Sequence, residues 1–117
     1  MKIPENVKYT NDHEWVLVNG NIGTIGITDY AQGELGDVVF VDIDSELAEI
    51  SKGESFGTIE AVKTVSDLFA PFNGKVIEIN KKLADSPELV NTDPFGEGWM
   101  IKAELKNPAD LDDLLNA

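Results

Sequence analysis

Lys63 is the side chain whose setting most favours a chemical role. It lies in GTIEAVKTVSD, residues 57–67, where β-branched residues favour strands on both sides of it. The small or apolar alternation from Gly57 to Ala61 breaks at Val62, which implies a turn. With Val62 and Lys63 as the central pair, neither glycine nor asparagine, type I geometry is favoured over the primed types. The ammonium would then stand at a protruding apex, within reach of another protein's active site. The alternative is an ordinary solvated lysine, since lysine is rarely buried.

Other catalytic arrangements find little support. The chain has no cysteine, which removes disulfides, thiolate nucleophiles and sulfur-rich zinc sites. His13 is the single histidine, so the H-E-x-x-H zinc motif cannot be completed. Ser66, Asp67 and His13 could be imagined as a hydrolase triad, but no nucleophile elbow surrounds the serine. The glycines at 20, 23 and 26 match no phosphate-binding loop. The acidic residues are too numerous to nominate a glycosidase pair.

The charge balance argues against a nucleic-acid partner. All nine basic residues are lysines, set against 22 acidic residues, for a net charge of -13. Such a surface repels phosphate backbones and offers no arginine for bidentate contacts. A basic protein partner fits better, because long-range attraction would raise the encounter rate. The alternative is that the charge only maintains solubility.

The length of 117 residues predicts a single domain, residues 1–117, and the 42% of hydrophobic residues is typical of a globular chain. No apolar run is long enough to cross a bilayer, and MKIPENVKYT lacks the features of a signal or transit peptide. We therefore expect a cytoplasmic protein without membrane contact.

Short strands separated by turns dominate the pattern, which predicts a sandwich or small barrel. Asn19-Gly20 signals a hairpin. Thr28 is a candidate N-cap of a short helix that ends before Gly33 or Gly36, and Asn107 a candidate N-cap of a C-terminal helix. The C-terminal helix would carry an apolar stripe of Leu111, Leu114 and Leu115. A helical turn is expected at residues 86–88 and a loop at residues 91–99. The expected strands cover residues 15–18, 22–27, 38–43, 55–61, 75–79 and 99–105.

Five motifs, spread from Lys8 to Leu115, together resemble the glycine cleavage system H-protein family: YTNDHEWV, GITDYAQGELGDVVFVDI, EAVKTVSD, LADSPELVN and DPFGEGWMIK. The resemblance implies an all-β fold with a few short helices, the barrel-sandwich hybrid of lipoyl and biotinyl domains. It also implies that Lys63 receives lipoic acid through an amide bond. Ala61 departs from the family's usual serine, and Thr64-Val65 replace two smaller residues, which puts a rim contact with a partner in doubt.

The implied function is that of a carrier without catalysis of its own. In the family, glycine decarboxylase (the P protein, dependent on pyridoxal phosphate) releases carbon dioxide and leaves an aminomethyl group on a lipoyl sulfur. The aminomethyltransferase (T protein) passes the carbon to tetrahydrofolate, and dihydrolipoamide dehydrogenase (L protein) reoxidises the dithiol. A lipoate ligase or an octanoyl or lipoyl transferase attaches the group. We expect a monomer from a bacterial cytoplasm, with a mature mitochondrial copy as the alternative.

The resemblance also carries three acidic residues into the site. Glu14 and Asp67 match carboxylates thought to hold the aminomethyl cation, which a surface cleft would protect from water. Glu60 matches a position that lipoyl-bearing domains favour, as an arm contact or a recognition residue. The alternative is that all three are plain surface acids.

Three other functions stay open at this point. The chain could be a lipoyl or octanoyl relay protein that supplies lipoate to other enzymes, or a binding module whose lysine is never modified. A biotin carrier is disfavoured, because biotinyl domains usually flank their lysine with methionines, whereas Val62 and Thr64 flank Lys63.

Overall fold

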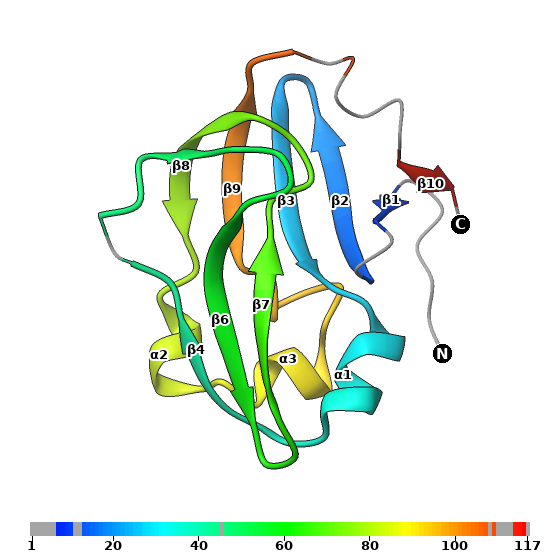
Figure 1. The fold of residues 1–117 in the computed structure, drawn as a ribbon, viewed down its shortest axis with the longest axis vertical. Helices are drawn as coiled ribbons and strands as arrows, with labels where there is room; N and C mark the ends of the chain where they lie inside the picture. The colour runs from blue at the N-terminus through cyan, green and yellow to red at the C-terminus, as the bar shows by residue number, and fades with distance from the viewer. Residues whose placement is uncertain (1–6, 11–12, 45, 108, 110–113, 117) are drawn as a thin grey trace.

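The computed structural model describes residues 7–10, 13–44, 46–107, 109 and 114–116. In these residues strands predominate and the helices are short (Figure 1), so the predicted all-β class with a few short helices is confirmed. The elements are β1 (Val7–Tyr9), β2 (Glu14–Asn19), β3 (Ile22–Ile27), α1 (Asp29–Leu35), β4 (Val38–Asp42), β5 (Glu49–Ile50), β6 (Ser55–Ala61), β7 (Val65–Phe69), β8 (Gly74–Ile79), α2 (Lys82–Asp85), α3 (Leu89–Thr92), β9 (Ile101–Leu105) and β10 (Leu115–Asn116).

The larger sheet has the antiparallel strand order β10-β1-β2-β3-β9-β8-β5. Its β2–β3 hairpin confirms the prediction from Asn19-Gly20, although the two turn residues are Gly20 and Asn21, because Asn19 pairs with Ile22. Gly20 has φ +61°. A positive φ at the first central residue is what a type II′ turn requires, and glycine adopts it at no steric cost.

The smaller sheet has the order β4-β6-β7 and carries the predicted lysine hairpin. Strand β6 has the predicted bounds, and it pairs with β4 on one side and β7 on the other. A register shift after Val38 leaves both Val39 and Phe40 exposed on β4. The tip between β6 and β7 projects beyond the body of the molecule at the lower end of Figure 1.

The apolar core lies between the two sheets. Trp15, Phe72, Ile25, Ile59, Leu68 and Met100 are among its largest fully buried side chains. The Phe72 ring lies close to two glycines, where added Cβ atoms on Gly23 or Gly74 would approach its carbons to 2.8 Å. The indole of Trp15 donates from Nε1 to the Pro94 carbonyl at 2.9 Å, which ties the loop before β9 to β2. This core makes the sheets a rigid base for the hairpin.

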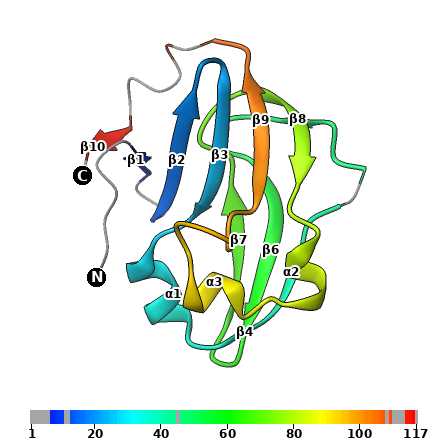
Figure 2. The same cartoon turned by 180° about the vertical axis from the view of Figure 1, so that it is seen from behind.

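The three helices gather at the end of the molecule where the β6–β7 tip projects (Figures 1 and 2). Helix α1 begins as predicted, with the Ala31 N–H donating to Thr28 Oγ1 at 3.1 Å. It continues past Gly33 to end at Leu35, before Gly36. Helix α2 was not predicted, and α3 begins just after the turn expected at residues 86–88.

The prediction for the C-terminus is wrong in part. Leu115 lies in strand β10, paired with Tyr9 of β1, and not in a helix. Strand β1 offers the backbone hydrogen-bond partners at the edge of the larger sheet, and this pairing outweighs the helical spacing of the leucines. Leu114 packs against the core, and the Ala109 N–H donates to Asn107 Oδ1 at 3.1 Å, as at a cap. Leu111 lies outside the described residues.

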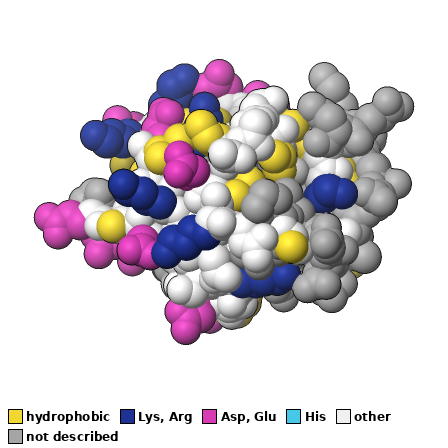
Figure 3. Space-filling view, turned by 90° about the horizontal axis from the view of Figure 1, so that it is seen from above, with side chains coloured by type: hydrophobic (Ala, Val, Ile, Leu, Met, Phe, Trp, Pro, Cys, Tyr) yellow, Lys and Arg dark blue, Asp and Glu magenta, His cyan; other side chains and the backbone are white. Residues whose placement is uncertain are grey.

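The surface mixes both signs of charge at the end opposite the hairpin tip, where lysine and acidic side chains are interspersed (Figure 3). Lys106, just after β9, forms a close ion pair with Glu49 of β5. Across the described ranges, no helix has the length and apolar character needed to cross a membrane.

Candidate functional site

The hairpin that carries Lys63 has a two-residue turn. Glu60 pairs with Val65, and the Ala61 N–H donates to the Thr64 carbonyl at 2.8 Å, which leaves Val62 and Lys63 as the central residues. Of the non-glycine residues that the structure describes, only His13 has a positive φ. Primed turns are therefore excluded, as predicted.

Lys63 is exposed at this tip, and its ammonium has no hydrogen bond or ion pair within the described part of the chain. Its neighbour Val62 is 71% exposed and Val65 is 61% exposed. Apolar side chains exposed beside a projecting amine are typical of a surface that another protein contacts.

The segment between α1 and β4 supports the tip from one side. The Val62 N–H donates to the Asp37 carbonyl at 2.9 Å, and Ala61 pairs with Val38. Gly36 has φ +82°, and the aliphatic carbons of Lys63 lie over it, 3.4 to 3.5 Å from where a Cβ would be. The stem of the lysine is thus held by packing while its ammonium stays exposed.

A cleft of about 160 Å³ opens where the start of β2, helix α1 and strand β7 meet. Three carboxylate residues line it, Glu14, Glu34 and Asp67, together with His13 and Ser66. The remaining lining is apolar and comes from Ile27, Ala31, Leu35, Ile59 and Leu68. An apolar wall beside carboxylates suits a small organic cation, because the wall limits water around an ion pair.

Glu14 is the best-fixed of these acids, with 2% of its surface exposed. Its Oε2 accepts from the Phe69 N–H at 2.7 Å, on the edge of β7, and its own N–H donates to Thr10 Oγ1 at 3.1 Å. Asp67 is exposed and pairs in register with Thr58. It follows Lys63 by four residues along the same hairpin, so their Cα atoms lie at most about 14 Å apart.

The structure brings together two of the three predicted acidic residues. Glu14 and Asp67 line one cleft, but Glu60 does not, since it lies on β6 between Phe40 and Val65. Glu34 was missed by sequence reasoning. No local pattern shows that this face of the short helix lies beside β2 and β7.

His13, Ser66 and Asp67 do meet at the cleft, but not as a triad. No hydrogen bond joins the serine to the histidine in the described ranges, and a nucleophile needs that contact with its base. The His13 ring instead packs on Tyr30, with centroids 4.7 Å apart. Among the residues that the structure describes, no group of His, Cys, Asp and Glu is placed to hold a metal ion.

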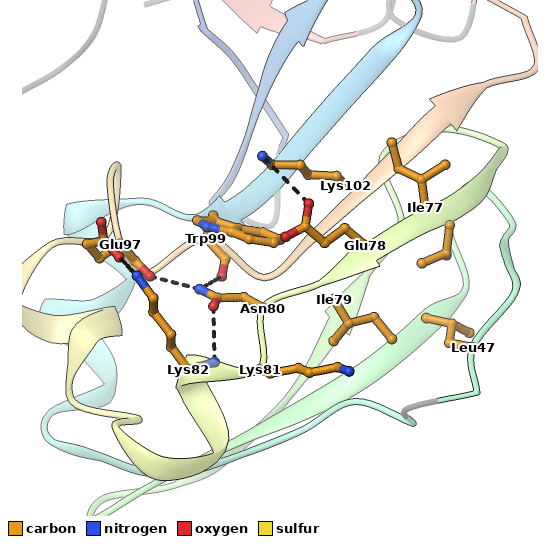
Figure 4. Close-up of a pocket in the computed structure, with 11 residues that line it drawn as sticks. Leu47, Ile77, Glu78, Ile79, Asn80, Lys81, Lys82, Glu97, Trp99 and Lys102 are labelled. Carbon is orange, nitrogen blue, oxygen red and sulfur yellow. Dashed lines mark hydrogen bonds and ion pairs between the residues drawn. The ribbon is translucent and has the colours of Figure 1, made fainter.

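A larger open groove of about 780 Å³ lies along β8 and α2 (Figure 4) and contains none of the predicted site residues. Four of its five charged side chains are paired within the groove, and the fifth, Lys81, is exposed. Lys82 pairs with Glu97 at 2.6 Å, and Lys102 lies 4.0 Å from Glu78 and over the Trp99 ring. The Asn80 amide donates to the carbonyls of Glu97 and Trp99. These interactions tie β8 and α2 to β9 and the segment before it, which gives the groove a structural role.

Comparison with known proteins identifies the family. The family model described as "Glycine cleavage H-protein" matches residues 7–117. The chain belongs to the glycine cleavage H-protein family. It is 59% identical over 117 residues to the glycine cleavage system H protein of Bacteroides fragilis, covering 100% of this chain and 93% of that protein. It is 56% identical over 115 residues to the one from Symbiobacterium thermophilum, covering 98% and 90%.

A solved structure agrees. The crystal structure of a glycine cleavage system H protein from Mycobacterium marinum matches with a TM-score of 0.88 at 39% identity, covering 98% of this chain and 93% of that one. The predicted lipoyl-domain-like sandwich is thereby confirmed. As a member of this family, the chain is a carrier component of the glycine cleavage system.

Proposed function

We propose that residues 1–117 form one lipoyl-carrier domain and that Lys63 is the residue that carries lipoic acid, in amide linkage. The observation that carries this proposal is the position of Lys63 as a central residue of a projecting two-residue turn. An attaching enzyme must reach the ε-amine in its own active site, and the exposed tip offers it without rearrangement of either strand. Glu60 stays a prediction as a recognition residue, since its carboxylate lies outside the cleft.

The residues of the chain fit a lipoyl group. The stem of Lys63 is held against Gly36, the exposed tip leaves room for an acyl chain, and the cleft beside β7 offers an apolar wall. When attached, the group supplies a disulfide whose sulfurs accept the aminomethyl group of glycine and two electrons. The chain itself supplies no catalytic residue in this proposal.

The carboxylates of the cleft then have a holding role. Glu14 is oriented by the Phe69 N–H, so one of its oxygens is fixed before any cation arrives. Asp67 adds a second negative charge on the strand that leads from Lys63. A protonated amine between them gains charge-assisted hydrogen bonds, and the apolar wall keeps water from the carbon beside it.

The partners we propose are glycine decarboxylase, the aminomethyltransferase and dihydrolipoamide dehydrogenase, with a lipoate ligase or an octanoyl or lipoyl transferase for attachment. A net charge of -13 favours basic docking faces on them. The bacterial relatives support a bacterial cytoplasm as the location, and we propose a monomer. A relay role and an unmodified binding module are not favoured by family membership.

Reconstitution tests the proposal. Purified glycine decarboxylase is assayed for exchange of labelled bicarbonate into glycine, with the lipoylated chain, with Lys63→Arg and with Lys75→Arg. Lys75 is an exposed lysine of β8, so its substitution controls for the loss of one lysine. We expect exchange with the parent chain and Lys75→Arg and none with Lys63→Arg. Equal exchange with all three chains would refute the assignment of Lys63.

A further inference from the structure

The motif LADSPELVN contributes no residue to the cleft, yet one of its side chains reaches the segment that supports the lysine. Asn91, on α3, donates from Nδ2 to the Gly36 carbonyl at 2.9 Å. Its Oδ1 accepts from the Val38 N–H at 2.8 Å. The same amide therefore makes two hydrogen bonds, with the residues on either side of Asp37. Two such bonds fix both the position and the orientation of a short backbone segment.

The residue between these two anchors is the one that holds the hairpin tip. The backbone carbonyl of Asp37 accepts a hydrogen bond from the N–H of Val62, the residue immediately before Lys63. Gly36 provides the surface on which the lysine stem lies. The hydrogen bond from Val62 and the stem contact of Lys63 thus both run through the segment that Asn91 holds.

Asn91 is itself well anchored. Its neighbour Val90 is fully buried in the core, and the α3 backbone continues into the turn at Pro94 that Trp15 holds. The contacts from Asn91 span 53 and 55 residues of sequence. They connect α3, which is anchored in the core by Val90, to a tip that strand pairing alone would leave freer to bend.

We propose that Asn91 is a positioning residue that fixes the direction in which the β6–β7 tip presents Lys63. The proposal rests on the proposed function only for its consequence in transfer, since the contact itself is independent of lipoylation. Loss of the two hydrogen bonds lets the backbone of residues 36–38 move. Because the Asp37 carbonyl accepts from the Val62 N–H, the Val62 amide then also moves more freely. The tip then samples more directions, and a partner enzyme captures the lysine less often at low concentration.

The test compares Asn91→Leu with Asn80→Leu. Asn80 is a matched control, because its buried amide also bridges backbone groups, but those of Lys82, Glu97 and Trp99. Amide hydrogen exchange is measured by NMR on the unmodified chain. In Asn91→Leu we expect Val62 to exchange about tenfold faster relative to the core amides of Ile25 and Ile101. In Asn80→Leu we expect no change in that ratio.

A second readout separates positioning from general stability. With lipoate ligase, we expect Asn91→Leu to raise the KM for the chain about threefold or more at unchanged kcat, and Asn80→Leu to leave both unchanged. Asn91→Asp keeps the acceptor for Val38 and loses the donor to Gly36. It should give an intermediate effect, and it serves if Asn91→Leu does not fold.

If the ratio of amide exchange at Val62 to that at the core amides stays unchanged in both Asn91→Leu and Asn91→Asp, the inference is overturned. A parent chain that never gains lipoate would instead overturn the proposed function, while leaving the exchange result to decide the role of Asn91.

Discussion

The side chain of Lys63 lies across the backbone of Gly36, with its Cδ and Cε 3.4 Å from where a Cβ on the glycine would be. The glycine has φ +82°, a conformation that residues with a Cβ rarely adopt. One residue therefore meets two demands, a left-handed backbone between α1 and β4 and a flat surface for the lysine stem. The exposed amine stands on a defined support and not on a loose loop.

Replacing this glycine should harm both stability and presentation. We expect Gly36→Ala to lower the free energy of unfolding by about 1–2 kcal/mol, because of the positive φ. Gly53→Ala is the matched control, since Gly53 has φ +85° with open space around it. Urea unfolding should show similar losses for both variants. Only Gly36→Ala should slow lipoylation, and equal lipoylation rates would show that the stem contact has no role.

The acids of the cleft should lengthen the lifetime of the loaded carrier. We expect Glu14→Gln and Asp67→Asn each to raise the rate of aminomethyl loss to water severalfold, because each removes one charge-assisted contact worth about 1–2 kcal/mol. The measurement is ammonia release from the loaded chain without the aminomethyltransferase.

Asp42→Asn provides the control for that experiment. Asp42 is exposed on the same sheet and pairs with Thr58 opposite to Asp67, but it does not line the cleft. Its substitution should leave the loss rate unchanged. If the loaded Glu14→Gln chain lost its aminomethyl group as slowly as the loaded parent chain, Glu14 would have no holding role in the cleft. The same result for Asp67→Asn would exclude Asp67.

The contact between Gly26 and Trp15 should be intolerant of added volume. A Cβ on Gly26 would lie 2.6 Å from Cε2 and Cζ2 of the buried indole, whose position is restrained by the hydrogen bond from Nε1 to the Pro94 carbonyl. We expect Gly26→Ala to cost about 2–3 kcal/mol in urea unfolding followed by tryptophan fluorescence. Gly33→Ala, in open space on α1, should instead stabilise by about 0.5–1 kcal/mol. A neutral Gly26→Ala would show that the indole of Trp15 can shift to make room for a methyl group.

The ion pair between Glu49 and Lys106 should be visible in the titration of the carboxyl group. The hydrogen bond and charge of Lys106 lower the pKa of Glu49, with a smaller contribution from Lys75. Because the folded-state pKa is depressed, the stabilisation is present above the ordinary value near 4.5 and is lost as the pH falls through the lower folded value. NMR titration of Lys106→Met should show the Glu49 pKa rising, and Lys75→Met should raise it less. An unchanged Glu49 pKa in Lys106→Met would show that Lys106 is not the cause of the shift.

Local sequence signals predicted the parts of the fold that depend on near neighbours. The alternation that ends at Val62 predicted both the end of β6 and the turn that displays Lys63. The Thr28 cap predicted the start of α1. These features are decided by side-chain sterics and by hydrogen bonds within a few residues.

Features that depend on distant pairing were not visible. Leu115 lies in a strand because the β1 edge provides hydrogen-bond partners more than a hundred residues away in sequence. The bonds of Asn91 to residues 36 and 38 and the meeting of Glu34 with Glu14 arise from how α1 and α3 pack on the sheets. No local pattern encodes those distances, so the cleft became definable only with the tertiary structure.

The most direct test of the central claim is the intact mass of the chain after expression with lipoate in a lipoylation-competent host. Parent, Lys63→Arg and Lys75→Arg chains are compared, with a known lipoyl domain in the same cells as the positive control. We predict a gain of one lipoyl group in the parent and in Lys75→Arg, and no gain in Lys63→Arg. A lipoyl group retained by Lys63→Arg, or absent from the parent while the control domain is modified, would contradict the assignment of Lys63 as the lipoyl carrier.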